Sequence, residues 1–397
     1  MKILLSNQFF YNVGGTETMF FKLLNFLKKE GHELIVITVE SKKNLNINGI
    51  KIYYVKSYVQ QNRFMSPLNR IFNYNSYKIT KKIIEMEKPD IAHFYNTSLI
   101  SSSPILACLK NKIPTIKTFN DYEHLCPDSS KTKWSKFCDK EMGIFNCLKC
   151  DRRNVNPSLL TVLYYNTIIK NFELSIFRKT INVSICETIK KALDQSKIDS
   201  RVIYQSIYLP KNIPKLKYTA NILYAGRLSK EKGVNYLIEA FSNLKNKNAK
   251  LLIVGDGPER KKLENLAKNY GLSQRIKFLG FVDKSTLQNL YEDVDFIVLP
   301  SVWQEPFGLT GLEAMSYGRP VIAFDVGGIS EYVSNNENGF LVDVFNVKSL
   351  AEKMETLLSD KDLLLKFSKN SIETSKKFSD EIFYKKIKNL YRNVLND

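Results

Sequence analysis

Two glutamates, Glu305 and Glu313, stand eight residues apart just after a predicted strand. The run VDFIVLP, residues 294–300, is typical of a buried strand, and a polar loop follows it. Glu305 lies in this loop, and Glu313 lies one to two turns into a helix that is predicted to begin near Phe307–Gly308. Eight helical residues span about 80° of rotation and ~12 Å of rise, so both carboxylates could face one elongated ligand and hold its sugar hydroxyls. The same spacing also fits surface glutamates on an amphipathic helix.

Groups that favour phosphate are predicted beside these carboxylates. The segment FGLTG is rich in small residues, which let backbone amides at the helix N-terminus approach an anion closely. Its residues are Phe307, Gly308, Leu309, Thr310 and Gly311. The string GRLSKEKG supplies Arg227, which offers a bidentate fork, and Lys232, which offers a mobile point charge. Together these cations could hold a diphosphate, although two cations at this spacing are also common by chance.

Parallel strands are needed to bring such residues together, and the sequence predicts them in both halves of the chain. Residues 1–40 read as strand (KILLS), helix (about Glu17–Glu30) and strand (ELIVITV), with Gly14 and Gly15 before the helix. The second half repeats the pattern with the strands NILYAG, KLLIVG, IKFLGFV, VDFIVLP and PVIAF. Sheets of this kind bind ligands at the carboxyl ends of their strands. His93 lies toward that end of the predicted strand DIAHFYN.

Length and composition indicate a globular chain with two domains. The chain has 397 residues, of which 44% are hydrophobic and 12% aromatic, and it is too long for one ordinary core. No apolar run reaches the ~18–20 residues that a membrane-spanning helix needs, and Met1 leads into a predicted strand rather than a signal peptide. We therefore expect a cytoplasmic location.

The formal net charge of +19 is the strongest bulk feature. It could reflect a phosphorylated substrate, an anionic membrane surface or nucleic acid, or only a Lys-rich composition. Zinc-finger, RNP and helix-turn-helix patterns do not stand out, so no nucleic acid partner is expected. Cations interleaved with aromatic residues between Gly49 and Asp90 could dock on the inner face of the cell membrane, or form the solvated face of an ordinary helix. These cations are Arg63, Arg70, Lys78, Lys81 and Lys82.

Four cysteines lie within one predicted loop: Cys126, Cys138, Cys147 and Cys150. The last two form Cys-x2-Cys, and four thiols in one loop would complete the shell of a structural zinc ion. Reduced thiols without a metal are the alternative, and disulfides are disfavoured in a cytoplasmic chain. Cys108 and Cys186 lie in apolar runs and are expected in the core.

The block EPFGLTGLEAMSYGRPVIAFDVGGISE, together with GRLSKEKG, resembles the signature of the retaining glycosyltransferases of group 1 (family 4). Those enzymes have the GT-B fold, an α/β architecture in which two Rossmann-like domains with parallel sheets face a central cleft. The resemblance implies that Glu305 contacts the donor sugar at the reaction centre and that Glu313 binds the ribose of the nucleotide. It implies that Arg227 and Lys232 hold the diphosphate.

The resemblance extends to further parts of the chain. Gly14 and Gly15 resemble the glycine loop that these enzymes turn toward the donor phosphate and the acceptor, and Gly226 opens the phosphate-binding motif. Phe281 stands where the family's backbone meets the nucleobase, although it could instead be a core residue. The cysteine pattern resembles that of a subset of the family.

One position departs from the family pattern. Asn120 stands where members often carry a histidine close to the transferring sugar. Asp121 or His124 could take over that role, or the acceptor site could be built differently. The chemistry on the acceptor side therefore stays open.

The implied domain layout has an acceptor-binding domain first and a nucleotide-sugar-binding domain second. The first covers residues 1–200 with the Cys-rich loop at 121–153, and a linker follows at 201–218. The second covers residues 219–378, and a terminal helix at 379–397 is expected to cross back onto the first domain.

The function implied is that of a retaining, metal-independent glycosyltransferase. It would move a sugar from a nucleoside-diphosphate sugar to a glycan or a polyprenyl- or other lipid-linked acceptor, in the synthesis of surface polysaccharide or lipopolysaccharide. No Asp-x-Asp motif stands at a strand end to hold a catalytic metal. The alternatives are a transferase with a small sugar acceptor, and an inactive nucleotide-sugar-binding or nucleic-acid-binding protein on the same scaffold.

Overall fold

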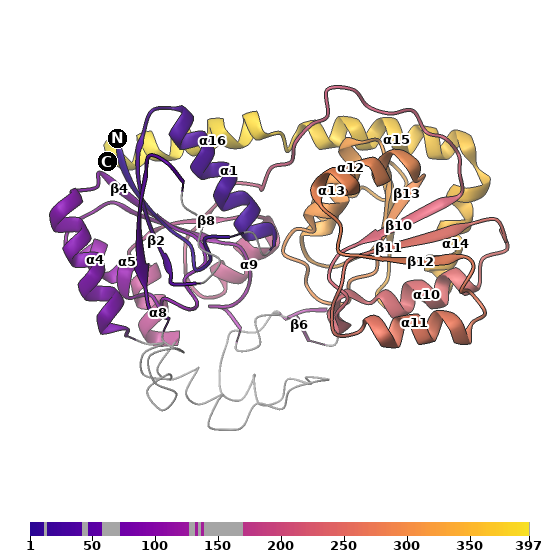
Figure 1. Ribbon diagram of the computed structural model, residues 1–397, viewed down its shortest axis with the longest axis horizontal. Coiled ribbons are helices and arrows are strands. Elements are labelled where there is room, and N and C mark those ends of the chain that lie inside the picture. The colour runs from indigo at the N-terminus through magenta and orange to yellow at the C-terminus, as the bar shows by residue number, and fades with distance from the viewer. Residues whose placement is uncertain are drawn as a thin grey trace, which may run out of the picture. The chain divides into compact units, whose positions relative to one another are not determined.

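The computed structural model describes residues 1–11, 14–41, 47–57, 72–126, 132–133, 136–138 and 170–396. Contacts within the chain divide it into two compact units (Figure 1). The first unit contains the described residues up to Lys133, those from Cys138 to Gln205, and the end of the chain from Phe383. The second contains Ser206–Ile382 and the described residues Lys136–Phe137.

A seven-stranded parallel sheet forms the centre of the first unit, in the order β3-β2-β1-β4-β5-β8-β9. Its strands are β1 (Lys2–Ser6), β2 (Glu33–Val39), β3 (Ile50–Val55), β4 (Ile91–Phe94), β5 (Thr115–Phe119), β8 (Ile181–Ser184) and β9 (Arg201–Val202). The helices of this unit are α1 (Gly15–Lys29), α4 (Tyr74–Glu87), α5 (Ser103–Lys110), α8 (Lys170–Phe177) and α9 (Glu187–Asp194). The two-residue strands β6 (Thr132–Lys133) and β7 (Lys136–Phe137) form a separate sheet.

The last helix, α16 (Asp380–Asn396), completes the first unit from Phe383 onward. Figure 1 shows it lying beside α1. The rings of Phe26 on α1 and Tyr384 on α16 are stacked, with their centroids 3.9 Å apart. Tyr391 is buried and its hydroxyl lies 2.8 Å from Nδ1 of His93 on β4. The end of the chain is therefore joined to the middle of the first sheet.

A six-stranded parallel sheet forms the centre of the second unit, in the order β12-β11-β10-β13-β14-β15. Its strands are β10 (Asn221–Ala225), β11 (Lys250–Val254), β12 (Ile276–Gly280), β13 (Phe296–Leu299), β14 (Val321–Phe324) and β15 (Gly339–Val342). The helices are α10 (Val234–Ser242), α11 (Arg260–Asn269), α12 (Lys284–Asp293), α13 (Leu309–Ser316), α14 (Val347–Ser359) and α15 (Lys361–Lys376), with short 3-10 turns η2 (Lys230–Lys232) and η3 (Gly327–Glu331).

Both sheets follow from apolar runs that are covered on two faces. In β13 and β14 every residue is buried, as expected for the central strands of a parallel sheet. The predicted α/β class with two Rossmann-like parallel sheets is confirmed. In each sheet the strand order reverses direction beside the first strand, between β1 and β4 and between β10 and β13. Ligands in open α/β sheets bind at such a switch point, outside the carboxyl ends of the strands.

The helices α5, α10, α12 and α15 were not predicted from the sequence. The reason is clearest in α15, whose buried stripe contains Ser368, Ser371 and Ser375 beside Leu364 and Phe367. A stripe in which three of five buried side chains are serine carries a weak helical periodicity in hydrophobicity, although its small side chains allow close packing. At Gly318, which precedes β14, the Ser368 hydroxyl lies only 2.8 Å from where a Cβ would be.

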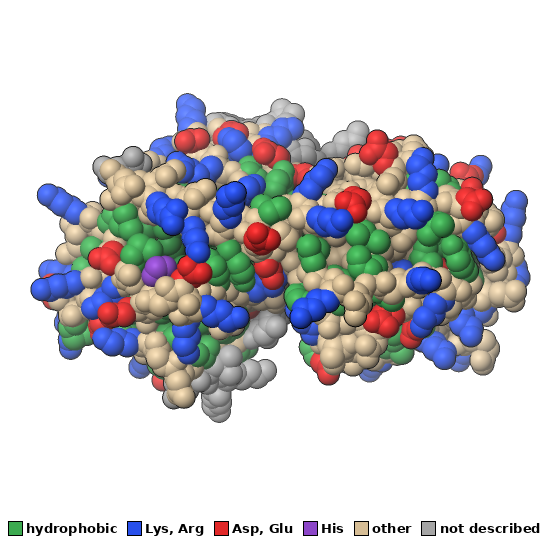
Figure 2. All heavy atoms as spheres, turned by 90° about the horizontal axis from the view of Figure 1, so that it is seen from above, with side chains coloured by type: hydrophobic (Ala, Val, Ile, Leu, Met, Phe, Trp, Pro, Cys, Tyr) green, Lys and Arg blue, Asp and Glu red, His purple; other side chains and the backbone are tan. Residues whose placement is uncertain are grey.

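The surface carries the positive charge in a dispersed form. Figure 2 shows Lys and Arg side chains spread over one face of both units, with Asp and Glu side chains among them. Among the described helices, none is both long and apolar enough to cross a membrane. Lys78, Lys81 and Lys82 are exposed along α4, whereas Arg63 and Arg70 lie outside the described residues.

Candidate functional site

The loops that follow β10 and β13 meet at the switch point of the second sheet and enclose a pocket. Its lining comes from the end of β10, from the loop with Lys232, and from the segment between β13 and α13. The lining residues include Tyr224, Gly226, Lys232, Ser301, Glu305, Gly308 and Thr310. The pocket therefore brings together five predicted site positions from two separate motifs: Gly226, Lys232, Glu305, Gly308 and Thr310.

Glu305 is the best-held side chain of this pocket. Three donors meet its Oε2 atom: Lys232 Nζ at 2.7 Å, Trp303 Nε1 at 2.9 Å and the Ser301 hydroxyl at 3.0 Å. Lys232 also donates to Oε1 at 2.9 Å, and its ammonium lies 5.4 Å from the centre of the Trp303 ring. The carboxylate is thus fixed in one orientation, and its side chain is 11% exposed toward the pocket.

Two glycines hold the backbone that carries Glu305. Gly327 has φ +58°, and a Cβ there would lie 2.0 Å from the carbonyl oxygen of Glu305. Gly328 donates its backbone N–H to that same oxygen at 2.8 Å. Gln304 accepts a hydrogen bond from the Gly327 N–H at 3.0 Å. Only glycine allows the turn after β14 to approach the Glu305 loop this closely.

The loop with Lys232 is fastened to the end of β13 in a similar way. Gly233 has φ +64°, and a Cβ there would lie 2.0 Å from the carbonyl oxygen of Pro300. Val302 donates its backbone N–H to the carbonyl oxygen of Glu231 at 2.9 Å. Lys232 ends the short turn η2, so the fixed backbone on both sides presents its ammonium to Glu305.

The helix α13 begins beside the pocket, as predicted. Its N-cap, Gly308, has φ +73° and its carbonyl oxygen accepts a hydrogen bond from the Tyr332 hydroxyl at 2.8 Å. Gly311 lies in the first turn, and a Cβ there would lie 2.6 Å from Cδ1 of Leu299. These small residues let the amino end of the helix lie directly over the end of β13.

Five other predicted positions do not line this pocket. Arg227 is exposed, and its carbonyl oxygen accepts a hydrogen bond from the Tyr224 hydroxyl. Glu313 is half-buried on α13. The pKa of Tyr291 is raised mainly by the burial of Tyr291 and next by the charge of Glu313. Phe281 is 86% exposed after β12, so the alternative of a core phenylalanine is wrong. Leu309 begins α13, and Phe307 is buried against Tyr332 and Phe378.

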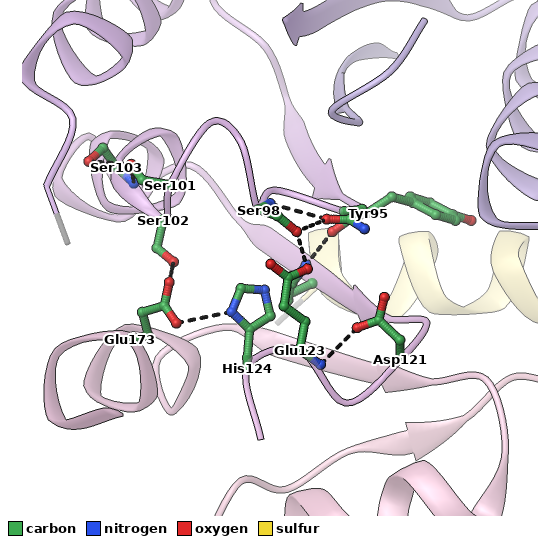
Figure 3. A network of polar contacts seen from close by, with 11 residues as sticks. Tyr95, Ser98, Ser101, Ser102, Ser103, Asp121, Glu123, His124 and Glu173 are labelled. Carbon is green, nitrogen blue, oxygen red and sulfur yellow. Dashed lines mark hydrogen bonds and ion pairs between the residues drawn. The ribbon is translucent and has the colours of Figure 1, made fainter. Parts of the chain in front are cut away.

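A second polar cluster lies at the carboxyl ends of β4 and β5 in the first unit (Figure 3). Asp121 Oδ1 accepts the backbone N–H of Glu123 at 2.9 Å, and Glu123 accepts a hydrogen bond from the Ser98 hydroxyl. His124 Nδ1 lies 3.0 Å from Glu173 Oε2, while Oε1 of Glu173 accepts from Ser102. Asp121 and His124, both predicted from the sequence, therefore belong to one network, and His124 is oriented by a buried carboxylate.

Lys117 is a buried cation beneath this cluster. It lies on β5, is 2% exposed, and its ammonium donates to the carbonyl oxygen of Tyr95. Burial lowers the pKa of Lys117 to about 8, although the charges of Asp121, Glu123 and Glu173 oppose that change. An ammonium inside a sheet is costly unless such groups surround it.

The amino end of α1 differs from the expectation of a free phosphate site. Gly14 is the N-cap and Gly15 the first residue of the helix. The carboxyl of Glu17 is buried there, and hydrogen bonds from Asn7 and from the backbone of Glu17 and Gly14 act on it. Burial raises the pKa of Glu17 despite these bonds, and the charge of Asp121 adds to the increase. The Glu17 carboxyl therefore already takes some of the hydrogen bonds that the backbone at Gly14 and Gly15 was expected to offer to a bound anion.

His93 is a structural residue, and its predicted place in a site is wrong. Its side chain is fully buried, with Nδ1 2.8 Å from the Tyr391 hydroxyl and Nε2 2.7 Å from the Thr118 hydroxyl. Burial lowers the pKa of His93 to about 3. Cys108 and Cys186 are buried, which confirms their expected place in the core.

The proposed zinc ligands cannot be assembled from the described residues. Cys126 and Cys138 are both half-buried, while Cys147 and Cys150 lie outside the part of the chain that the structure describes. The structural zinc therefore stays a prediction.

Several residues of the two clusters were missed by the sequence reasoning. Ser301 and Trp303 stand in the polar loop before Glu305, so their place after a predicted strand was an available signal. Lys117 interrupts the apolar strand IPTIKTFN, which was a second signal. Glu173 comes from a distant helix, and nothing in its local sequence indicates a contact with His124.

Two family models match the chain over most of its length. The model described as "Glycosyl transferases group 1" matches residues 210–374, and the model described as "Glycosyltransferase Family 4" matches residues 13–153. An uncharacterized glycosyltransferase of Methanocaldococcus jannaschii, MJ1607, is 28% identical over 364 residues, which cover 88% of this chain and 86% of that protein.

Solved structures show the same fold. Sucrose-phosphate synthase from Thermosynechococcus elongatus aligns with a TM-score of 0.75 and 20% identity, covering 100% of this chain and 99% of that one. The Anabaena protein HepE in complex with UDP and glucose aligns with a TM-score of 0.73 and 18% identity, covering 99% of this chain and 100% of that one. The predicted GT-B type of fold is confirmed.

Proposed function

We propose that the chain is a group 1 glycosyltransferase, as the family models that match residues 210–374 and 13–153 support, and that it transfers a sugar from a nucleoside-diphosphate sugar with retention of configuration. The acceptor would be a glycan or a lipid-linked glycan in the synthesis of surface polysaccharide or a related glycoconjugate. The observation that carries the proposal is the fixed Glu305–Lys232 pair in a pocket at the switch point of the second sheet.

The charges of this pocket suit a departing diphosphate. Lys232 is 22% exposed and lines the pocket beside Glu305, so it can contact a phosphate without leaving its place. The amino end of α13 adds partial positive charge from the Gly308 side. Arg227 would approach from the exposed face of the same loop. Fixed donors and cations stabilise charge that develops as the bond to the leaving group breaks, so a catalytic metal is not needed.

The roles of the other donor-site residues follow from their places. Glu305 would contact the hydroxyls of the donor sugar, since its carboxylate is fixed and faces the pocket. Glu313 would bind the ribose from its half-buried place on α13, and the exposed segment at Gly280–Phe281 would contact the nucleobase. The solved HepE complex contains UDP and glucose, which makes a uridine nucleotide the first one to test.

Thermal stabilisation of the purified protein by UDP, GDP, ADP and dTDP tests this donor site. One nucleotide should raise the unfolding temperature by several degrees at a concentration about 100 times its Kd. The increase should be lost in Glu313→Ala and Lys232→Ala, and should persist in Lys261→Ala, which changes a charge on α11 instead. No increase with any nucleotide in the wild type would overturn the proposal.

The first unit could bind the membrane that carries a lipid-linked acceptor. On α4, Lys78, Lys81 and Lys82 are exposed together with Tyr74 and Met86, which are 65% and 53% exposed. Cations beside exposed apolar side chains favour anionic lipid surfaces. Flotation with liposomes should therefore recover the protein when phosphatidylglycerol is present, and less of it in 0.5 M salt. Equal recovery with neutral liposomes, or none with either, would contradict membrane docking.

A further inference from the structure

A small hollow opens at the carboxyl ends of β4 and β5, within the network of Figure 3. Its lining includes Asn96, Lys117, Asn120, Asp121 and Glu123, and also Tyr95, whose carbonyl oxygen accepts a hydrogen bond from Lys117. The volume of the hollow is about 10 Å³. This is the space of about one water-sized group. The hollow can take one polar substituent of a ligand, but not a whole sugar ring.

Asn120, one of the residues that line this hollow, carries an unsatisfied side-chain donor. Asn120 is 8% exposed, and its Nδ2 has no hydrogen-bond partner among the described residues. Its Oδ1 lies 3.5 Å from Gln205 Nε2, so the amide NH2 group points away from Gln205. A buried donor without a partner carries a cost in free energy. A ligand oxygen in the hollow would remove that cost.

The charges around the hollow are mostly negative, although the whole chain has a net charge of +19. Asp121, Glu123 and Glu173 interact electrostatically with one cation, Lys117. The ammonium of Lys117 already donates to the Tyr95 carbonyl. The balance is negative, because three carboxylates face one lysine ammonium. A carboxylate or phosphate group of a ligand would be repelled here, and a hydroxyl or ammonium group would not.

We propose that this hollow binds one hydroxyl or amino substituent of the acceptor sugar and rejects acidic substituents at that position. Asn120 donates to the substituent's oxygen, and the carboxylates of Asp121 and Glu123 accept its hydrogens. The inference rests on the proposed function only in taking the ligand to be a sugar acceptor. It requires any phosphate of a lipid-linked acceptor to lie outside the hollow.

Four methyl α-glucosides that differ only at carbon 6 test the inference. They carry a hydroxyl, an ammonium, a carboxylate or a phosphate group there, and their binding to the full chain is measured by ligand-observed NMR without nucleotide. The hydroxyl and ammonium compounds should bind at least tenfold more tightly than the two acidic ones. In Glu123→Gln, affinity for the ammonium compound should fall at least fivefold, and affinity for the hydroxyl compound should change less than twofold. Glu123→Gln keeps an oxygen for the Ser98 hydroxyl and should fold.

Asp121→Asn is the second variant, and Glu85→Gln, which removes an exposed carboxylate on α4, is the matched control. The control should bind all four compounds like the wild type. The inference is overturned if either acidic compound binds as tightly as the hydroxyl compound, or if neither pocket variant alters the discrimination. It is also overturned if no compound binds to a folded protein. Thermal stabilisation by nucleotides is measured separately. A protein that binds no nucleotide can therefore be distinguished from one whose hollow does not bind the sugar substituent.

Discussion

At Glu305, three hydrogen-bond donors converge on a single carboxylate oxygen, and one of them is a lysine that also lines the pocket. The arrangement fixes Glu305 before any ligand arrives. Electrostatic preorganisation of this kind avoids reorganisation when charge moves during a reaction. It also means that Lys232 has two roles, as the partner of Glu305 and as a contact for the leaving group.

We predict that Lys232→Ala lowers turnover roughly 100-fold or more, because the pocket loses the cation nearest the departing diphosphate. The matched control is Lys230→Ala, two residues earlier in the same short turn, where the side chain is exposed. Turnover of the proposed donor and circular dichroism are measured on both variants. A folded Lys232→Ala enzyme with nearly normal turnover would remove Lys232 from the reaction centre.

Trp303→Phe is predicted to lower turnover roughly tenfold, because Glu305 Oε2 loses one of its three donors. The phenylalanine keeps an aromatic face for the Lys232 ammonium, so nucleotide affinity should change little. Separate measurements of kcat and of UDP affinity distinguish the two effects. An equal loss in both would indicate collapse of the loop instead of a misplaced carboxylate.

At the scale of elements, the site depends on the close approach of two turns to the ends of β13. The turn at Gly327 contacts the Glu305 backbone, and the turn at Gly233 contacts the Pro300 backbone. Both glycines have positive φ, so neither the space nor the conformation suits another residue. The parallel strands position these turns, and the turns position the charged side chains.

Gly327→Ala is predicted to lower the free energy of unfolding by about 2–4 kcal/mol, since the added Cβ would meet the Glu305 carbonyl and the backbone would be strained. Gly271→Ala is the matched control, because Gly271 also has positive φ, +70°, but has nothing within 4 Å of an added Cβ. The control should cost only about 1 kcal/mol. Denaturant unfolding of both variants gives the comparison. Equal losses would mean that the close contact at Gly327 contributes nothing.

At the scale of the whole molecule, strands and motifs could be predicted from the sequence, and contacts between distant segments could not. β13, the following loop and α13 were predictable because an apolar run, a polar loop and small residues follow one another within about 20 positions. The cluster around Asp121 was not, because Asn96, Lys117 and Glu173 reach it from separate elements. His93 was assigned to a site from its place on a strand, since no local signal reveals that Tyr391 covers it.

The burial of His93 makes the free energy of unfolding of the protein depend on pH. The pKa of His93 in the folded state is about 3, below the ordinary value of 6.5, because its buried site favours the neutral imidazole. The stabilisation of the folded state by neutral His93 is fully present above pH 6.5 and is lost as the pH falls toward 3. We predict a loss of about 2–3 kcal/mol from this residue between pH 6.5 and 4.5.

The His93 contribution is isolated by comparing the wild type with His93→Gln in denaturant unfolding at several pH values. The variant should be less stable at pH 7 but should lose less stability on acidification. Parallel pH curves for the two proteins would contradict the predicted role of His93.

The partner of His93, Tyr391, belongs to the last helix of the chain, whereas the rest of the first unit is encoded before Ser206. A ribosome therefore finishes the whole of the second unit before it supplies the segment that completes the first. During synthesis, the surface of the first unit that α16 covers stays exposed while about 180 further residues are made. At the order of 5–20 residues per second, that wait lasts roughly ten to forty seconds in a bacterium-like translation system. Because the His93–Tyr391 contact forms only at the end of synthesis, we expect chaperones to bind the nascent first unit. A stop codon placed before Phe383 should produce an aggregated protein instead of a shorter enzyme.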